Sequence, residues 1–237
     1  MPDSTMPNHH WQNAEYERIA RTLTGRPDVR AVSPSGSFAS GTHDALSDLD
    51  LTVVGLDPAD VQAVLGRFDA ANVLGQERYI GPGAALYRVL LASGRQYDIK
   101  VLRTEQSADD DVLKVTLGGT DEFWFALHAA HHALVRGREV VALDLVLASC
   151  RAVTQAYWDV PKTTQAEIRS GLRQLEVGLD STSLAESIAY VGTLAGLAFD
   201  DEERARAFST ILSGRTRAWA RQLAAAGPDK SPGRPPA

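Results

Sequence analysis

Residues 36–51 read GSFASGTHDALSDLDL, and the end of this stretch decides how the rest of the chain is interpreted. From Leu49 to Val54 the sequence alternates and is rich in β-branched residues, which predicts a β-strand. Asp48 and Asp50 are two residues apart, so their side chains leave the same face of that strand. The apolar residues that follow each of them point to the other face, toward a core. The stretch therefore predicts a strand that presents two carboxylates side by side.

The two carboxylates predict a cation site. Side by side they repel each other, and a cation between them removes the repulsion. Oxygen-only ligation suits Mg²⁺, which binds through one or two carboxylates and completes its shell with water and substrate phosphates. We therefore expect Asp48 and Asp50 to bind Mg²⁺ together with a polyphosphate.

Gly36 and Ser37 open the same stretch and predict a contact with that polyphosphate. A Gly-Ser pair that begins a short helical turn presents backbone N–H groups, which can bind the outer phosphates of a nucleoside triphosphate. Gly36 allows a close approach, the Ser37 hydroxyl can donate one more hydrogen bond, and Gly41 closes the turn. His43 and Asp44, in the loop that follows, are interpreted as structural or solvent-facing.

A third acid is expected from a neighbouring strand. Residues 96–102 alternate in the same way, so Asp98 and Lys100 share one face and the apolar residues that follow them are buried. Asp98 is a candidate second metal ligand, or the group that takes the proton from an attacking hydroxyl. Lys100 is a candidate for neutralising charge on the triphosphate, and a solvated lysine is an equal alternative.

A Gly-Ser pair, ten intervening residues and Asp-x-Asp, with a third Asp on a later strand, resemble the polymerase-β-type nucleotidyltransferase superfamily. The likeness is strongest to small antibiotic-modifying members, the aminoglycoside and lincosamide nucleotidyltransferases, and its strong part covers residues 35–54. The resemblance implies that Gly36 and Ser37 contact the nucleotide phosphates. It also implies that catalysis and metal binding belong to three acids, Asp48, Asp50 and Asp98.

The resemblance and the order of elements predict an α+β protein with two domains. Residues 1–107 are expected to form a nucleotidyltransferase catalytic domain, with a mixed sheet and flanking helices. Residues 119–226 are expected to form a C-terminal helical bundle, and the proline-rich residues 227–237 a disordered tail. Strands are predicted at 29–32, 49–54, 72–80, 85–92 and 96–102, and helices at 11–23, 58–71, from 121 onward, 139–158, 164–179, 184–198 and 201–223.

Composition narrows the class of protein. The chain has 237 residues and a formal net charge of -6, without the basic stripe that proteins relying on nucleic-acid phosphates normally carry. We therefore expect no nucleic-acid partner. No apolar run predicts a signal peptide, and no window approaches the roughly 20 apolar residues of a membrane helix, so a cytoplasmic protein without a membrane partner is expected. The single cysteine, Cys150, is interpreted as a small buried residue.

Together these features predict an enzyme of the EC 2.7.7 type with a role in antibiotic resistance. It would use Mg²⁺ to transfer a nucleoside monophosphate, AMP from ATP by preference, to a hydroxyl of a small molecule such as an aminoglycoside or lincosamide. Pyrophosphate would be released. The resemblance is also compatible with a homodimer. Three alternatives stay open: a protein or toxin–antitoxin partner as acceptor, action on RNA ends, and a nucleotide-binding sensor without catalysis.

Other side chains are weaker candidates. Three histidines lie close together on a predicted helix, but without an HExxH pattern they are interpreted as packing or exposed rather than as a zinc site: His128, His131 and His132. Acids and aromatics of the second domain suit an acceptor pocket, although capping, core or surface roles are favoured for each: Glu122, Trp124, Asp144 and Tyr157. Glu122 is also an alternative general base. Arg136 and Arg138 are interpreted as a charged turn.

Overall fold

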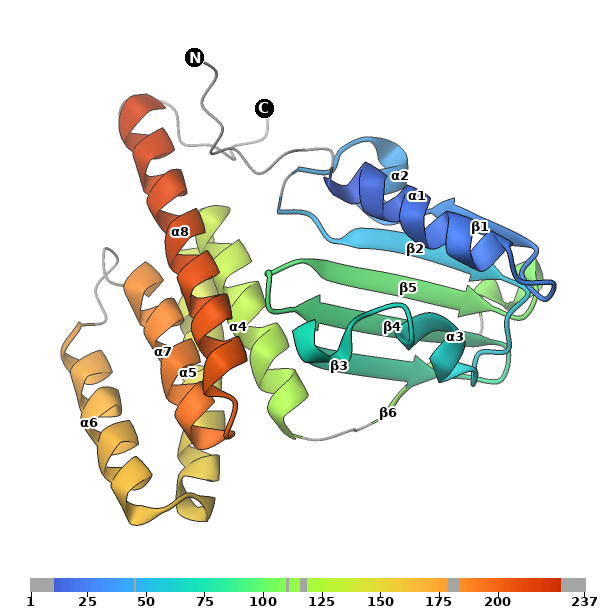
Figure 1. Ribbon diagram of the computed structural model, residues 1–237. Coiled ribbons are helices and arrows are strands. Elements are labelled where there is room, and N and C mark those ends of the chain that lie inside the picture. The colour runs from blue at the N-terminus through green and yellow to red at the C-terminus, as the bar shows by residue number, and fades with distance from the viewer. Residues whose placement is uncertain (1–10, 45, 110, 116–118, 179–183, 227–237) are drawn as a thin grey trace. The chain divides into compact units, whose positions relative to one another are not determined.

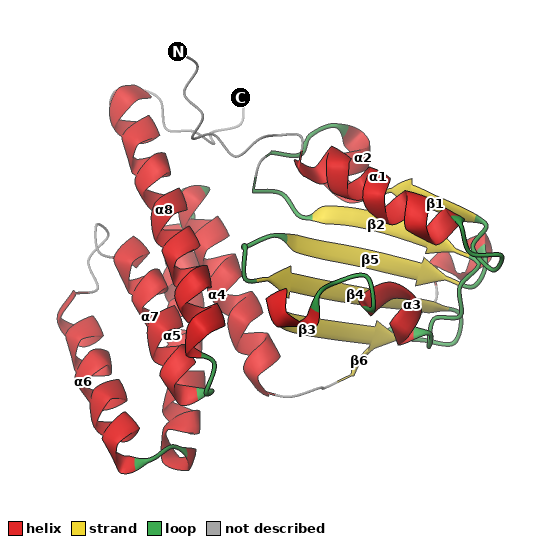
Figure 2. Ribbon diagram, in the orientation of Figure 1, coloured by secondary structure: helices red, strands yellow, loops and turns green. Residues whose placement is uncertain are grey.

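The computed structural model describes residues 11–44, 46–109, 111–115, 119–178 and 184–226 (Figure 1). Tertiary contacts group the chain into two units, one of residues 1–91 and 95–121 and the other of residues 92–94 and 122–237. The first contains a mixed sheet with helices, and the second is helical in its described part, which confirms the α+β class (Figure 2). The tail predicted to be disordered, residues 227–237, lies outside the described residues.

The first unit is built on a six-stranded sheet in the order β1-β2-β5-β4-β3-β6 (Figure 1). β2 and β5 run parallel, and the other neighbouring strands run antiparallel. Two predicted strands, 49–54 and 96–102, have the observed bounds, and the other three are shifted by one or two residues. The strands are β1 (Ala31–Pro34), β2 (Leu49–Val54), β3 (Val73–Ile80), β4 (Ala84–Leu91), β5 (Gln96–Leu102) and β6 (Leu113–Val115).

One face of the sheet forms the core beneath α1 (Trp11–Thr24) and α3 (Val61–Leu65) (Figure 1). The alternation in β2 and β5 directs every second side chain toward these helices. The buried side chains of this core include Ile19, Leu23, Leu49, Leu51, Val53, Val64, Tyr87, Val89, Tyr97, Ile99 and Val101. The prediction that the apolar residues of both strands are buried is therefore confirmed, and the polar residues between them lie on the opposite face.

The helix predicted at 58–71 is wrong in length. The chain forms only α3 and, after a break, a short 3₁₀ turn at Ala70–Asn72. Asp60 accepts a hydrogen bond from the Ala63 backbone at 3.0 Å, and Asp69 accepts one from the Ala71 backbone at 3.1 Å. Each acid thus caps a separate short segment, a role that competes with continuation of one long helix.

The segment between the two predicted domains contains regular structure that the sequence analysis did not predict. A 3₁₀ turn covers Glu105–Asp109, and β6 then pairs with the end of β3, so that Tyr79 lies opposite Lys114. β6 was not predicted, because three residues are too few for a periodic pattern to appear. Its pairing depends on the exposed edge that β3 offers.

The helical unit contains α4 (Gly119–Val135), α5 (Glu139–Ala156), α6 (Lys162–Gly178), α7 (Leu184–Ala198) and α8 (Glu202–Ala226). α7 is apolar around most of its surface and packs against α5, α6 and α8. The predicted helices are confirmed to within a few residues. Gly137, with φ +70°, follows α4 and confirms the turn expected between Arg136 and Arg138.

Two aromatic candidates of the helical unit have packing roles, which the sequence favoured for them. Trp124 is 1% exposed and meets the rings of Phe123 and Phe208 edge to face. Tyr157 is buried and accepts a hydrogen bond from Arg169. Among the acids proposed for an acceptor pocket, Glu122 and Asp144 are both exposed, on α4 and α5.

The segment Glu139–Asp159 is long and apolar enough to cross a membrane by length and composition, with a mean hydropathy of 1.3. The expectation that no window approaches such a helix is therefore wrong by this measure. Core helices of soluble proteins meet the same criteria, so length and hydropathy do not assign the segment to a membrane.

Candidate active site

Three carboxylates come together on the face of the sheet opposite to the α1–α3 core. In the parallel register of β2 and β5, Asp50 lies directly beside Asp98, and neighbouring strands are about 4.8 Å apart. Asp48 immediately precedes β2, and Gln96 of β5 donates a hydrogen bond to it at 3.1 Å. Asp48, Asp50 and Asp98 are named the acid patch. The structure thus places the third predicted acid beside the first two.

The Gly36–Ser37 turn lies against the acid patch. Gly36 begins the short helix α2 (Gly36–Ser40) with φ +55°, and a Cβ atom there would lie 2.3 Å from Asp50 Oδ2. Only glycine fits this position without moving the carboxylate. The Ser37 backbone N–H donates a hydrogen bond to the Asp50 side chain, so the turn contacts a residue of β2 directly. Gly41 ends the turn at φ +69°, as predicted.

Ionisation of the Asp50 carboxyl group is unfavourable at this position. Burial raises the pKa of its carboxyl to about 6, and the neighbouring charge of Asp98 contributes to the increase, while Arg88 and the Ser37 amide oppose it. A divalent cation beside these oxygens would remove the penalty, because it replaces repulsion with attraction. The oxygen donors and their mutual repulsion therefore fit Mg²⁺.

Arg88 of β4 links the partly exposed Asp98 to a buried acid, Glu77. It lies between Asp98 and Glu77 in the sheet register. Its Nε is 3.2 Å from Asp98 Oδ2, and its Nη1 is 2.7 Å from Glu77 Oε2. Glu77 also pairs with Lys114 at 2.8 Å. Burial opposes ionisation of Glu77, but these cations outweigh it and lower the pKa of that carboxyl.

Two polar residues of the site were missed from the sequence, Arg88 and Gln96. Gln96 Nε2 donates to Asp48 Oδ2 at 3.1 Å and to Asp98 Oδ1 at 2.9 Å. A signal existed for both. Arg88 occupies an outward position of an otherwise apolar predicted strand, and Gln96 is two residues before Asp98, on the same face.

Lys100 shares the face of Asp98, as predicted, with Thr52 as its neighbour on β2. Its ammonium group donates to the Ala108 carbonyl at 2.6 Å. The structure thus shows Lys100 bound to the 3₁₀ turn at Glu105–Asp109, and its predicted contact with a triphosphate stays a prediction.

The loop before β2 is held by its own side chains. Asp44 Oδ1 accepts hydrogen bonds from the Leu46 backbone and the Ser47 hydroxyl, each at 2.9 Å. Gln12 of α1 is fully buried and donates to the Asp44 carbonyl at 2.9 Å and the Ser47 carbonyl at 3.2 Å. The structural interpretation of Asp44 is therefore correct. The hydrogen bonds of this loop fix the position of the chain just before Asp48 and β2.

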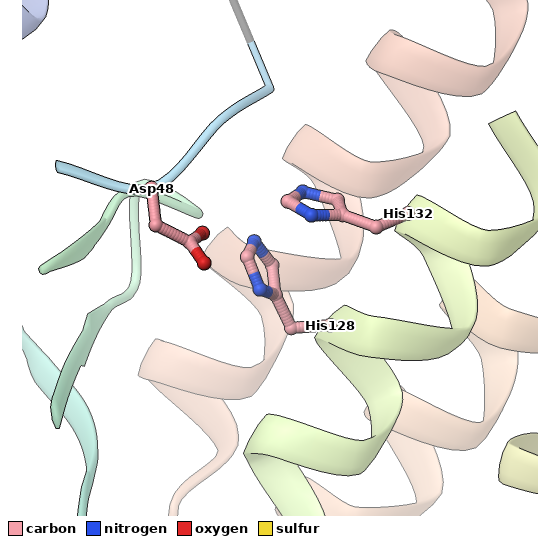
Figure 3. A group of neighbouring side chains, drawn as sticks. All are labelled: Asp48, His128 and His132. Carbon is pink, nitrogen blue, oxygen red and sulfur yellow. The ribbon is translucent and has the colours of Figure 1, made fainter. Parts of the chain in front are cut away.

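Figure 3 shows His128 and His132 one turn apart on α4, in the helical unit, and Asp48 on the segment before β2. The rings of the two histidines are 4.0 Å apart, and His128 Nε2 lies 3.1 Å from the Gly94 carbonyl, to which it donates. His131 is fully buried, and neither of its ring nitrogens has a hydrogen-bond partner within the described residues. The packing interpretation of the three histidines stays a prediction.

Comparisons with known proteins do not assign the chain to a family. No family model matches the chain, and no curated protein matches it either. The case for a function therefore rests on the acid patch and on the Gly36–Ser37 turn that contacts it.

Proposed function

We propose that this protein is a nucleotidyltransferase that uses Mg²⁺ to transfer a nucleoside monophosphate, AMP by preference, to a hydroxyl of a small molecule. One observation carries the proposal. Asp50 lies beside Asp98 on parallel strands, and Gly36 approaches Asp50 so closely that a Cβ atom would displace its carboxylate. A glycine–serine turn that contacts paired acids can hold a polyphosphate together with a divalent cation.

The acid patch is the proposed cation site. Asp48, Asp50 and Asp98 would supply the oxygen ligands, and the raised pKa of Asp50 is what a ligand position shows when its charge is not compensated. A bound Mg²⁺ would supply positive charge for the phosphate oxygens and fix the orientation of the triphosphate. Arg88 adds a fixed positive charge at the edge of the patch, 3.2 Å from Asp98.

Gly36 and Ser37 are the proposed contacts for the nucleotide phosphates. The space that a Gly36 side chain would fill is taken by the Asp50 carboxylate, so Gly36 would contact a phosphate through its backbone. We assign the Ser37 hydroxyl, rather than its amide, to phosphate binding. The amide already donates to Asp50. One turn would therefore orient both the nucleotide and a metal-binding carboxylate.

Asp98 is the proposed acceptor of the proton from the attacking hydroxyl. Hydrogen bonds from Gln96 at 2.9 Å and Arg88 at 3.2 Å hold its carboxylate in one orientation, which aligns the hydroxyl for in-line attack and release of pyrophosphate. Glu122, exposed on α4, stays the alternative base.

The proposed class of acceptor molecule rests on the resemblance to antibiotic-modifying nucleotidyltransferases. We propose an aminoglycoside or lincosamide, and hence a cytoplasmic enzyme of antibiotic resistance. The net charge of -6 suits a cationic acceptor. A homodimer is compatible with this proposal. A protein or toxin–antitoxin acceptor and a nucleotide sensor are the alternatives that experiment can distinguish.

The test has two stages. First, the melting temperature is measured with ATP, GTP, CTP and UTP, each with and without Mg²⁺. A nucleotide that stabilises the protein only with Mg²⁺ supports the site. Second, pyrophosphate release is measured across a panel of aminoglycosides and lincosamides. Stabilisation without release from any acceptor would favour the sensor or a protein acceptor, and a D48N variant with full activity would refute the assignment.

A further inference from the structure

We propose that Gln96 is a positioning residue that sets the separation and orientation of Asp48 and Asp98 for cation binding, an inference that rests on the proposed function. Its Nε2 atom donates to Asp48 Oδ2 at 3.1 Å and to Asp98 Oδ1 at 2.9 Å. The side chain is 5% exposed, so these bonds form away from bulk water. One amide group therefore bridges Asp48, which immediately precedes β2, and Asp98 on β5.

The sheet register explains why one residue can reach both acids. Leu49 lies beside Tyr97 and Asp50 beside Asp98, and Asp48 and Gln96 are the residues that immediately precede the first of these pairs on the two sides of the ladder. The four polar side chains occupy neighbouring positions on one face, three as carboxylates and the fourth as a carboxamide. Gln96 is beside Asp48 across the strands and two residues from Asp98 along its own strand.

A carboxamide has the chemistry for this role. Its NH₂ group has two N–H donors and no charge, so it can hold two carboxylates without neutralising them. A lysine at position 96 would compete with a cation for the same oxygens, and a glutamate would add repulsion.

Asp98 is held from both sides by this arrangement. Gln96 bonds its Oδ1, and Arg88 Nε lies 3.2 Å from its Oδ2. The same Gln96 side chain ties Asp48 to the neighbouring strand β5. Hydrogen-bond partners that orient metal ligands in this way affect metal affinity about 10- to 100-fold.

The experiment compares Q96M with Q76M in the full-length protein, with Mn²⁺ as the probe and isothermal titration as the readout. Methionine keeps the length of glutamine and removes its donors. Gln76 is paired with Val89 and belongs to the other face of the sheet, so Q76M is the matched control. We expect Q96M to weaken Mn²⁺ binding about 10- to 100-fold and Q76M to leave it unchanged.

A third variant separates positioning from packing. Q96E keeps the shape but places a fourth carboxylate in the group, so the metal-free melting temperature should fall and Mn²⁺ should raise it by more than in the wild type. A residue that only packs would change the metal-free stability and leave the response to Mn²⁺ as it is. If Q96M does not fold, Q96N carries the same test, because its shorter amide does not span both acids.

The outcomes distinguish the two proposals. A wild-type protein that binds neither Mn²⁺ nor Mn²⁺ with ATP overturns the proposed function and this inference with it. A wild type that binds, with Q96M and Q96E binding equally well and with the same thermal response, overturns the positioning role of Gln96 alone.

Discussion

The acid patch of the sheet is partly buried and His131 of α4 is fully buried, and the chain surrounds these ionisable side chains in different ways. The acids receive donors and counter-ions from neighbouring elements, namely Ser37, Arg88 and Gln96. His131 is completely buried with no hydrogen bond to its ring nitrogens among the described residues. Burial, with the charge of Arg215, lowers the pKa of His131 to about 3, so it is neutral.

The presence or absence of such partners distinguishes a candidate binding site from a packed core. Carboxylates that stay charged while partly removed from water need specific partners, and a ligand can compensate the cost of their desolvation. A neutral histidine has no charge to compensate, although its unpaired ring nitrogens still make burial costly. The partners of an ionisable cluster are therefore more informative about function than the number of its members.

The largest effect is expected when one acid of the patch is neutralised. D50N removes a proposed cation ligand whose contribution to the rate is several kcal/mol, so turnover should fall about 10³-fold or more. Pyrophosphate release and Mn²⁺ titration measure the loss. The matched change on α4, H131L, should leave Mn²⁺ binding by the folded protein unchanged. If H131L abolished Mn²⁺ binding, the proposed difference between the two regions would be wrong.

Next in size is the effect of a methyl group at Gly36. In G36A the new Cβ atom would be 2.3 Å from Asp50 Oδ2, so the carboxylate must turn away, and we expect Mn²⁺ affinity to fall about 100-fold. Gly41 is the control, because it has φ +69° and a Cβ atom there would meet no other atom within 4 Å. Both variants carry backbone strain of about 1 kcal/mol, and equal Mn²⁺ affinities in the two would contradict the role of Gly36.

The histidine core should weaken in acid. The folded-state pKa of His131, about 3, is below the unfolded value of about 6.5, so its stabilisation is complete above pH 6.5 and is lost as the pH falls toward 3. Between pH 7 and pH 5 this amounts to about 2 kcal/mol. Urea unfolding of wild type and H131L at both pH values measures it. If H131L keeps the full acid dependence, another group is responsible.

The smallest effect has the opposite sign. The folded-state pKa of Asp50, about 6, is above the unfolded value of about 3.9, so its ionisation destabilises the metal-free fold as the pH rises from 4 through 6. D50N should therefore raise the free energy of unfolding at pH 7.5 by about 1 kcal/mol, after allowance for solvent screening of a half-exposed group. Thermal unfolding in EDTA measures the gain, which should shrink at pH 4. A less stable D50N protein would show that the patch is not under electrostatic strain.

Periodicity predicted the central strands of the sheet well and its edges less well. β2 and β5 have the predicted bounds because full alternation over six or seven residues is unambiguous. α3 is shorter than predicted because Asp60 and Asp69 each cap a separate segment. β6 is stabilised by an edge of β3 that local sequence does not reveal.

Local sequence by itself determined that Asp48 and Asp50 leave one face of a strand, that Asp98 leaves the same kind of face on another, and that a Gly-Ser turn precedes them. These follow from the two-residue period of extended backbone and from the conformational freedom of glycine. Only the tertiary structure decided that β2 and β5 are parallel neighbours, which brings Asp98 beside Asp50. It also decided the partners Arg88 and Gln96, because cross-strand contacts depend on strand order and register, and these are set by packing of the whole sheet.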